Sequence, residues 1–335
     1  MKTILLTIAI LLMAVFTTCK REVVHYNTVA AQSNDDLAFT DTLRIPINDL
    51  GAGTFLGRTG GLYPGGVNMP FGAYATDLIK FARSIKPRDA AGVVTSSGVV
   101  GFIAIGGSTA GKMMTALTNK TIGNPLTNAS LKMANATNGE HSSSANSLIN
   151  PNDSIWIIIK DKLNRNDLAY TQVQVIYLET DDSTQTGGFP DRPLKLKQDY
   201  LEVMHIFKSK FPNIRLVYLL GRTTTFLNPD KLTIHNVEPS PYYNGWACKW
   251  LIEDQMNGVP GTRYKGVNAE MPLITWGWYE WAYGTSQPRQ DGFTWEESDT
   301  VDGLHGTPAG EDTLSNYFQN FLLTDPYAKV WYAKK

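Results

Sequence analysis

The sequence predicts a three-layer α/β fold of the flavodoxin-like type, with a central parallel sheet of about five strands. Three observations predict this fold. Short apolar runs alternate with amphipathic segments of helical length over most of the chain. Turns rich in glycine or polar residues follow the apolar runs, and no internal repeat or low-complexity block interrupts them. Strands that alternate with helices favour a parallel sheet that is covered on both faces.

The chain begins with the features of a secretion signal. Lys2 supplies the positive start, and an apolar stretch over 4–16 follows, too short to span a membrane comfortably. We therefore expect residues 1–18 to be a signal peptide. The stretch ends at Cys19 in a sequence that resembles a loose bacterial lipobox. That resemblance implies export and a lipid anchor on Cys19 in a bacterial envelope; ordinary cleavage nearby is the alternative.

The rest of the chain divides simply. Residues 19–40 are polar and mixed, and we expect them to form a tether. Residues 41–335 form one domain in this interpretation, because no linker interrupts them and the chain is long enough for a sizeable core. Cys248 stands between tryptophans and is expected to be a buried small hydrophobe. With Cys19 lipidated, no intrachain disulfide is possible.

The predicted elements follow in chain order. A glycine-rich loop covers 57–68, where backbone freedom rather than packing sets the conformation. The helix-period segments show apolar residues three and four apart, and the predicted strands are continuous apolar runs that stop at glycine or polar residues. We expect helices at 75–85, 109–117, 152–163, 194–211, 243–256 and 308–322, and strands at 99–105, 130–136, 173–178, 214–220 and 272–276.

The first of these strands ends in a glycine turn that carries Ser108. The carboxyl edge of an open α/β sheet is where ligands bind, and a hydroxyl beside helix N-terminal N–H groups is well placed for nucleophilic attack. Two other interpretations compete. Gly106 to Lys112 matches most of a phosphate loop, although Met113 stands where a magnesium-binding hydroxyl belongs. A plain glycine turn with a helix-capping serine is the third.

Near the end of the chain, Asp302 precedes His305 by three residues on a loop that opens a helix. An imidazole within reach of Ser108 would take its proton, and a carboxylate on the other ring nitrogen would fix the tautomer. A pair that only caps the last helix is the alternative. Export also weighs against a phosphate loop, because little nucleoside triphosphate exists outside the cytoplasm.

A serine after the first strand together with a late Asp-x-x-His motif resembles the SGNH (also called GDSL) hydrolases. The chain looks like a group of secreted bacterial SGNH-like proteins of unassigned substrate, and the resemblance covers nearly everything from about residue 50 onward. The segments that carry it are 60–68, 172–178, 211–219, 250–255 and 324–332.

The resemblance implies a role for each matching residue. Ser108 matches the nucleophile, Asp302 the acid and His305 the base. The N–H groups of Ser108 and Gly139 match two oxyanion donors. The third donor is usually an asparagine side chain, but here the matching position is Asp182, and an ionised carboxylate would repel an oxyanion. A shifted alignment with another donor, a protonated Asp182, or a weak or inactive enzyme would each account for this departure.

The remaining candidates concern the substrate. Trp278 lies in an aromatic segment after the last strand, where it would stack on a sugar or simply pack. Arg222 follows the fourth strand and would contact an acyl or anionic group, and Asn68 lies on a loop that could reach the site. The histidines lack metal-ligand spacing, so neither a metal nor another cofactor is predicted. A net charge of −1 provides no footprint for nucleic acid.

These observations predict an exported serine esterase that acts on acyl groups of a small molecule or a polysaccharide. The alternative is a carbohydrate-binding or surface protein that kept the fold and lost the chemistry. Asp182 favours the alternative, whereas the intact Ser108, Asp302 and His305 favour the enzyme.

Overall fold

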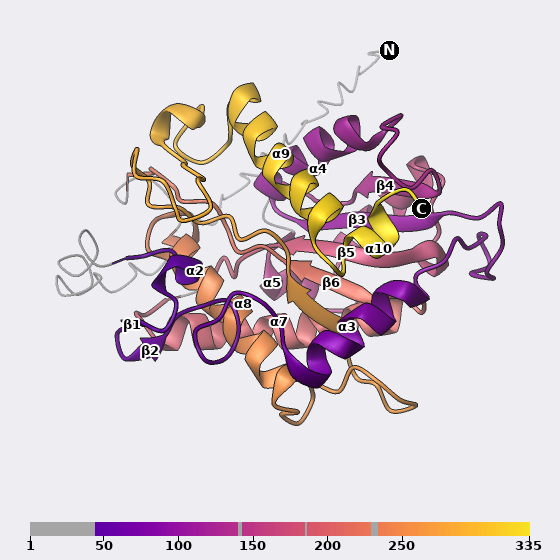
Figure 1. Cartoon of the computed structure of the whole chain (residues 1–335), viewed down its shortest axis with the longest axis horizontal. Coiled ribbons are helices and arrows are strands. Elements are labelled where there is room, and N and C mark those ends of the chain that lie inside the picture. Colours follow the sequence, from indigo (N-terminus) through magenta and orange to yellow (C-terminus); the bar gives the residue numbers. More distant parts are fainter. Residues whose placement is uncertain (1–43, 140–142, 185, 229–233) are drawn as a thin grey trace, which may run out of the picture.

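The computed structural model describes residues 44–139, 143–184, 186–228 and 234–335. The predicted signal peptide, the tether and Cys19 lie outside these residues. The described chain forms a central five-stranded sheet between two layers of helices (Figure 1). The strands are β3 (Val100–Gly106), β4 (Leu131–Asn135), β5 (Val173–Glu179), β6 (Leu216–Leu219) and β7 (Leu273–Trp276), with a separate two-stranded hairpin of β1 (Thr54–Phe55) and β2 (Arg58–Thr59).

The five-stranded sheet is entirely parallel and has the order β4-β3-β5-β6-β7. This is the flavodoxin-like order, so the predicted fold class is confirmed, and all five predicted strands are present within a few residues of their expected ends. The order reverses between β3 and β5, which makes the carboxyl ends of these two strands the topological switch point. The end of β3 carries Ser108, and the end of β5 carries Glu179.

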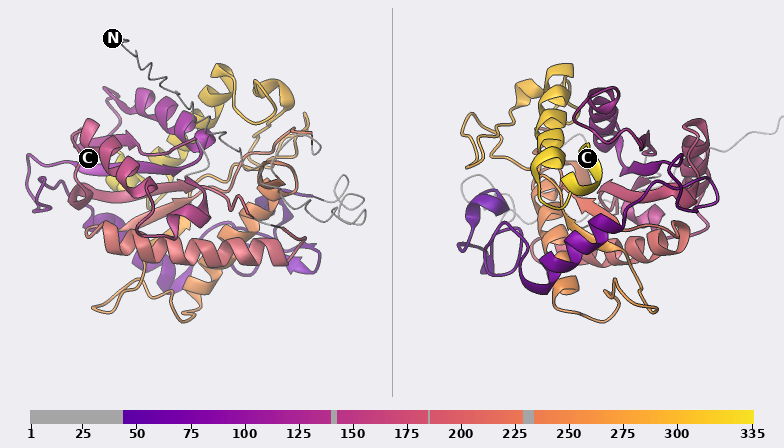
Figure 2. Two further views of the ribbon diagram at one scale, coloured as in Figure 1. Left: turned by 180° about the vertical axis from the view of Figure 1, so that it is seen from behind. Right: turned by 45° about the vertical axis from the view of Figure 1, so that its right-hand side comes forward.

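Both faces of the sheet are buried, which explains why its strands read as continuous apolar runs rather than alternating ones. One face packs against α5, α6, α7 and α8, and the opposite face against α3, α4, α9 and α10; the views in Figure 2 show the molecule from behind and after a 45° turn. The helices are α2 (Ile47–Leu50), α3 (Gly72–Ser84), α4 (Ser108–Thr121), α5 (Ala145–Leu148), α6 (Ile155–Arg165), α7 (Asp191–Lys210), α8 (Ser240–Met256), α9 (Pro308–Thr324) and α10 (Lys329–Tyr332).

Several helices begin earlier than the apolar spacing predicts. The helices α7 and α8 each start about three residues before the expected point, and each has a proline, Pro193 or Pro241, in its first turn. Proline is tolerated there because the first N–H groups of a helix have no intrahelical acceptor. The short α10 lacks a sequence prediction; its Trp331 indole N–H donates to the Tyr218 hydroxyl at 3.2 Å and fixes the chain end against the sheet.

The edge strand β7 is covered by side chains and by the glycine-rich loop. The N–H of Ile274 donates to the Gln255 side chain at 3.0 Å, and the hydroxyl of Tyr74 donates to the Ile274 carbonyl at 2.7 Å. The loop adds a bond from the Trp276 indole N–H to the Leu62 carbonyl at 2.6 Å. The first two bonds satisfy backbone groups of an edge that would otherwise pair with another strand. The third bond fixes the glycine-rich loop against the sheet.

Candidate active site

Ser108 is the first residue of α4 and follows the end of β3 by a single residue, Gly107. The turn is held to the neighbouring strand by the N–H of Gly107, which donates to the Glu179 carbonyl at 3.2 Å. A helix leaves its first N–H groups without intrahelical acceptors, so the N–H of Ser108 remains available beside its own hydroxyl. This local geometry agrees with the predicted strand–turn–helix unit.

Ser108, His305 and Asp302 form a chain of hydrogen bonds. The Oγ of Ser108 lies 2.7 Å from Nε2 of His305, and Nδ1 of His305 lies 2.7 Å from Oδ2 of Asp302. A carboxylate at Nδ1 places the ring proton there, which leaves Nε2 to accept the serine proton. The residues come from opposite ends of the domain sequence, 197 positions apart for the serine and the histidine.

Asp302 is held by its own loop. Its Oδ1 accepts the N–H groups of Leu304 at 3.0 Å and His305 at 2.7 Å. Partial burial raises the pKa of Asp302, but the hydrogen bonds from the His305 N–H, the His305 ring and the Leu304 N–H outweigh it and lower the pKa to about 2. Asp302 is therefore ionised at neutral pH, where its carboxylate can accept the ring N–H of His305. The Asp302 side chain is 49% exposed, so water also reaches it.

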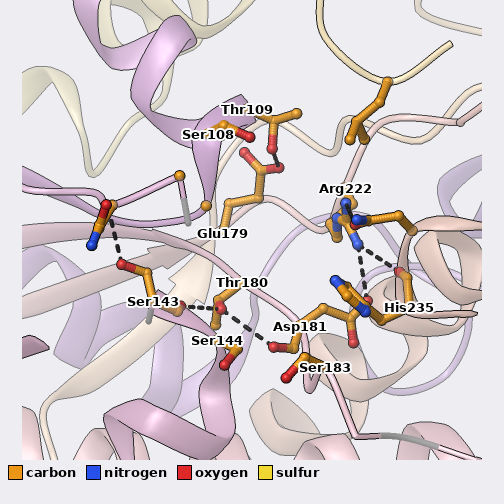
Figure 3. Close-up of a pocket in the computed structure, with 15 residues that line it drawn as sticks. Ser108, Thr109, Ser143, Ser144, Glu179, Thr180, Asp181, Ser183, Arg222 and His235 are labelled. Atoms are coloured by element: carbon orange, nitrogen blue, oxygen red, sulfur yellow. Dashed lines mark hydrogen bonds and ion pairs between the residues drawn. The ribbon is translucent and has the colours of Figure 1, made fainter. Parts of the chain in front are cut away.

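Gly139 lies against Ser108, as the predicted oxyanion donors require. A Cβ at position 139 would stand 3.0 Å from the Ser108 Cβ and 3.4 Å from its Cα. Both residues line a pocket of about 110 Å³ at the switch point (Figure 3). Within the described ranges, neither backbone N–H is donated to a protein acceptor. Two N–H groups are thus available beside the serine hydroxyl.

A Gly139→Ala variant should fold but act more slowly on an ester substrate. The new methyl group would displace Ser108 by a few tenths of an ångström, and small displacements of a reacting group lower rates by roughly ten- to a hundredfold. Steady-state kinetics would measure this, and thermal unfolding would verify that the variant is folded. Full activity in Gly139→Ala would contradict the close contact of Gly139 with Ser108.

The structure does not bring Asp182 to the pocket. This side chain is 1% exposed and turns toward α7; its Oδ1 accepts the N–H of Thr184 at 2.7 Å and the Thr184 hydroxyl at 2.6 Å. Asp182 is therefore not positioned as a third oxyanion donor. The preceding residue, Asp181, lines the pocket instead. Successive residues of an extended segment point to opposite sides, so assigning the wrong one of two adjacent aspartates changes which side chain faces the site.

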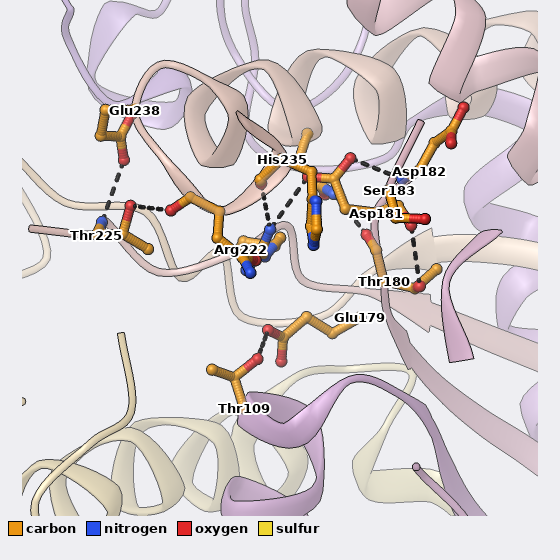
Figure 4. Close-up of polar contacts among 12 residues, drawn as sticks. Thr109, Glu179, Thr180, Asp181, Asp182, Ser183, Arg222, Thr225, His235 and Glu238 are labelled. Atoms are coloured by element: carbon orange, nitrogen blue, oxygen red, sulfur yellow. Dashed lines mark hydrogen bonds and ion pairs between the residues drawn. The ribbon is translucent and has the colours of Figure 1, made fainter. Parts of the chain in front are cut away.

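Arg222 lines the same pocket, as predicted for a substrate-contacting residue. Its guanidinium donates to the Asp181 carboxylate at 3.1 Å, to the His235 carbonyl at 2.8 Å and to the Asn236 side chain at 2.9 Å (Figure 4). Figure 3 places this group across the pocket from Ser108. Burial raises the pKa of Asp181 while Arg222 opposes that rise. The pair supplies a fixed positive charge and a carboxylate to the pocket wall.

Trp278 and Asn68 do not line the Ser108 pocket. Both line a second cavity beside β7. The Trp278 ring is buried and stacks on Tyr317, with ring centroids 5.0 Å apart. The prediction that Trp278 contacts a substrate at Ser108 is therefore not supported by its position. The reason is the strand order: β7 is the far edge of the sheet, three strands away from β3.

The phosphate-loop interpretation predicts a Lys112 side chain folded back over the turn. Lys112 is instead exposed on α4 and does not line the pocket. Over the described ranges, no group of three side chains could hold a metal ion, and no helix is long and apolar enough to cross a bilayer. His141 lies outside the described residues.

Buried carboxyl groups beneath the serine were not predicted. Glu179 lines the pocket and accepts the Thr109 hydroxyl at 2.5 Å, and its other oxygen accepts the Tyr177 hydroxyl at 2.5 Å. Tyr177 also lies 3.3 Å from Glu280, whose pKa burial and the charge of Glu179 raise well above its ordinary value. The only sequence signal was that Glu179 directly follows a predicted strand. Nothing in the sequence distinguished Glu280, which lies within the aromatic segment 276–283.

Glu311 makes the stability of the fold depend on pH. Burial raises the pKa of Glu311 to about 7, and the charge of Glu179 adds to the rise. The folded protein thus holds this proton more tightly than the unfolded chain, for which 4.5 is the ordinary value. The protonated Glu311 carboxyl therefore contributes to the free energy of unfolding. This contribution is fully present below about pH 4.5 and is lost as the pH rises through 7.

A Glu311→Gln variant, which is neutral at every pH, should be more stable than the parent at pH 8 by about 1–3 kcal/mol and equal to it at pH 4. Urea unfolding at both values would measure the difference. Asp312→Asn is the matched control, because Lys120 lowers the pKa of that exposed neighbour and no gain is expected. An equal gain at both pH values would show that Glu311 is not the titrating group.

Comparison with known proteins adds no relative: no family model matches the chain, and no curated protein matches its sequence.

Proposed function

We propose that the protein is a serine esterase in which Ser108 is the nucleophile, His305 the general base and Asp302 the acid that orients it. One observation carries this proposal: the two hydrogen bonds of 2.7 Å that join the three side chains in that order. The location supports it, because Ser108 stands at the switch point of a parallel sheet, where open α/β folds bind their ligands.

In this proposal the Ser108 hydroxyl attacks the ester carbonyl while Nε2 of His305 takes its proton. The oxyanion accepts hydrogen bonds from the backbone N–H groups of Ser108 and Gly139. His305 then protonates the departing alcohol, and water, activated by the same imidazole, hydrolyses the acyl-enzyme. Asp302 stabilises the imidazolium that forms during each half of the reaction.

The pocket favours a short acyl group. Its volume of about 110 Å³ is well below the 300–1,000 Å³ typical of drug-sized ligands. Its walls carry hydroxyl, amide, carboxylate and guanidinium groups, and a long alkyl chain would remove these polar groups from water. An acetyl-sized group fits this chemistry better than a fatty acyl group. The alcohol, whether a small molecule or a polysaccharide, would extend from the open side.

A second candidate is a fold that has lost the chemistry and binds carbohydrate or acts at a surface. One observation favours it: Asp181 brings a carboxylate to the pocket wall, where it would oppose an oxyanion. The Arg222 guanidinium, 3.1 Å from that carboxylate, offsets this charge. The intact chain from Ser108 to Asp302 makes the enzyme the better supported function.

The test is covalent labelling of the purified protein with a fluorophosphonate, followed by mass spectrometry of the labelled peptide. The proposal expects a label on Ser108 that is lost in Ser108→Ala and in His305→Ala. Acetyl, butyryl and octanoyl p-nitrophenyl esters would then rank the acyl groups, with acetyl fastest. If the folded protein neither takes the label nor cleaves any of these esters, the result contradicts the esterase proposal and supports the carbohydrate-binding or surface protein instead.

We also propose that the protein is exported and held at a bacterial envelope by lipid on Cys19. The support is the sequence pattern of the first 19 residues alone. Cells fed radiolabelled palmitate should label the parent chain and not a Cys19→Ala variant. A variant that keeps the label would exclude Cys19 as the anchor.

A further inference from the structure

A second cavity, of about 290 Å³, lies against the edge strand β7 and shares no lining residue with the Ser108 pocket. We call it the edge pocket. Its floor is Thr275 and Trp276 of β7, and its sides include Asn68 of the glycine-rich loop and Phe321 of α9. A helix rises about 1.5 Å per residue, so Phe321 lies about 20 Å along α9 from the end next to His305. The edge pocket is therefore a separate site.

The walls of the edge pocket combine aromatic and polar groups. Phe321 and Tyr327 supply ring surfaces, whereas Asp49 and Gln290 supply a carboxylate and an amide. A pyranose ring has the complementary surfaces, namely C–H faces that pack on aromatic rings and hydroxyl edges that both donate and accept hydrogen bonds. A lipid chain would remove the carboxylate and the amide from water, and an inorganic anion would not use the rings.

The polar wall is built before any ligand arrives. Arg289, which is 2% exposed, donates to the Tyr279 carbonyl at 2.5 Å and to Asp291 at 2.5 Å. The Asp49 carboxylate accepts the N–H of Gln290 at 3.1 Å. Groups that are already fixed lose little conformational entropy on binding, which favours recognition of a small ligand.

One buried atom in the wall lacks a partner. The side-chain oxygen of Asn48 is buried and accepts no hydrogen bond from any residue that the structure describes. The Asn48 carbonyl, in contrast, accepts the Asn68 side chain at 2.9 Å, so the residue is held in place. An unsatisfied buried acceptor is unfavourable by about 1–3 kcal/mol.

From these observations we propose that the edge pocket binds one sugar residue of a glycan. Its volume is near the lower end of the range for small-molecule sites, which suits one ring rather than several. Met69, 52% exposed at the loop, lines the rim, so a chain can continue from the bound ring into solvent. The proposal goes beyond the esterase function and does not depend on Ser108.

The experiment uses the mature chain with Ser108→Ala, so that no bound glycan is hydrolysed. Calorimetric titrations with hexaoses of glucose, xylose, mannose and N-acetylglucosamine should find at least one that binds with a single site. Asp49→Asn and Tyr327→Ala should each weaken that binding tenfold or more, whereas Asp312→Asn, outside both pockets, should leave it unchanged.

Thermal unfolding of each variant would verify that it is folded, and Asp49→Asn keeps the side-chain volume. The proposal is overturned if none of the four hexaoses binds, or if binding is equally strong in the two edge-pocket variants. Because fluorophosphonate labelling of the parent protein tests Ser108 independently, a failure of this proposal is distinguishable from a failure of the esterase assignment.

Discussion

Replacing Ser108 with alanine is expected to lower kcat for p-nitrophenyl acetate by on the order of 10⁵-fold or more. The variant keeps the oxyanion N–H groups and the pocket but has no oxygen to attack the carbonyl. His305 then activates only water, which is not held as the hydroxyl is held at 2.7 Å. The measurement is steady-state kinetics under saturating ester, corrected for the uncatalysed reaction.

Asp302→Asn supplies the graded comparison for this experiment. It should lower kcat less, by about 10²- to 10⁴-fold, because its half-exposed position lets water bond to Nδ1 of His305 in place of the carboxylate. Both variants should unfold within a few degrees of the parent, since neither side chain supports the core. A Ser108→Ala protein that kept a tenth of the parent rate would place the nucleophile elsewhere.

The central features of this site follow from local sequence rules. A buried parallel strand has to be apolar on both faces, and a glycine turn at its end places the next side chain at the carboxyl edge, so Ser108 could be located from residues 99–108. The three-residue spacing of Asp302 and His305 allowed a carboxylate and an imidazole to meet within one loop. These relations are short in sequence, and the structure reproduces them.

The parts that were wrong or missed depend on relations that are long in sequence. The position of Trp278 after the last strand placed it at the carboxyl edge of the sheet. It did not give the distance between Trp278 and Ser108 across the strands. Because β7 is three strands from β3, with strands about 4.8 Å apart, it lies about 14 Å to the side. Glu179, Glu280 and Glu311 come from three distant segments, and only the folded chain shows that their carboxyl groups interact.

The choice between Asp181 and Asp182 illustrates a further limit. Both residues follow the same strand, and composition does not distinguish them. Only the partners do: Arg222 holds Asp181 at the pocket, and Thr184 with Lys195 holds Asp182 on the other side. Because Asp182 does not face the pocket, the backbone N–H groups of Ser108 and Gly139 are the remaining candidate donors. Arg222 provides the positive charge on the opposite wall.

Gly106→Ala should have the largest effect on stability of any single methyl addition at the site. Gly106 has a φ of +148°, a conformation that L side chains rarely adopt, and a Cβ there would stand 1.8 Å from the Glu179 carbonyl oxygen. That oxygen belongs to the neighbouring strand and cannot rotate away. β3 would have to separate from β5 and weaken the bond from the Gly107 N–H to the Glu179 carbonyl, now 3.2 Å.

We expect Gly106→Ala to lower the free energy of unfolding by about 4 kcal/mol or more, a large fraction of the 5–15 kcal/mol of a typical domain, and to yield little soluble protein. Urea unfolding monitored by tryptophan fluorescence would measure this. Gly107→Ala tests the same chemistry one residue away, where φ is −77° and the new methyl group meets nothing within 4 Å, so its unfolding midpoint should stay close to that of the parent. Equal midpoints for the two variants would contradict the close approach of β3 to the Glu179 carbonyl, and with it the placement of Ser108 at a rigid turn between the two central strands.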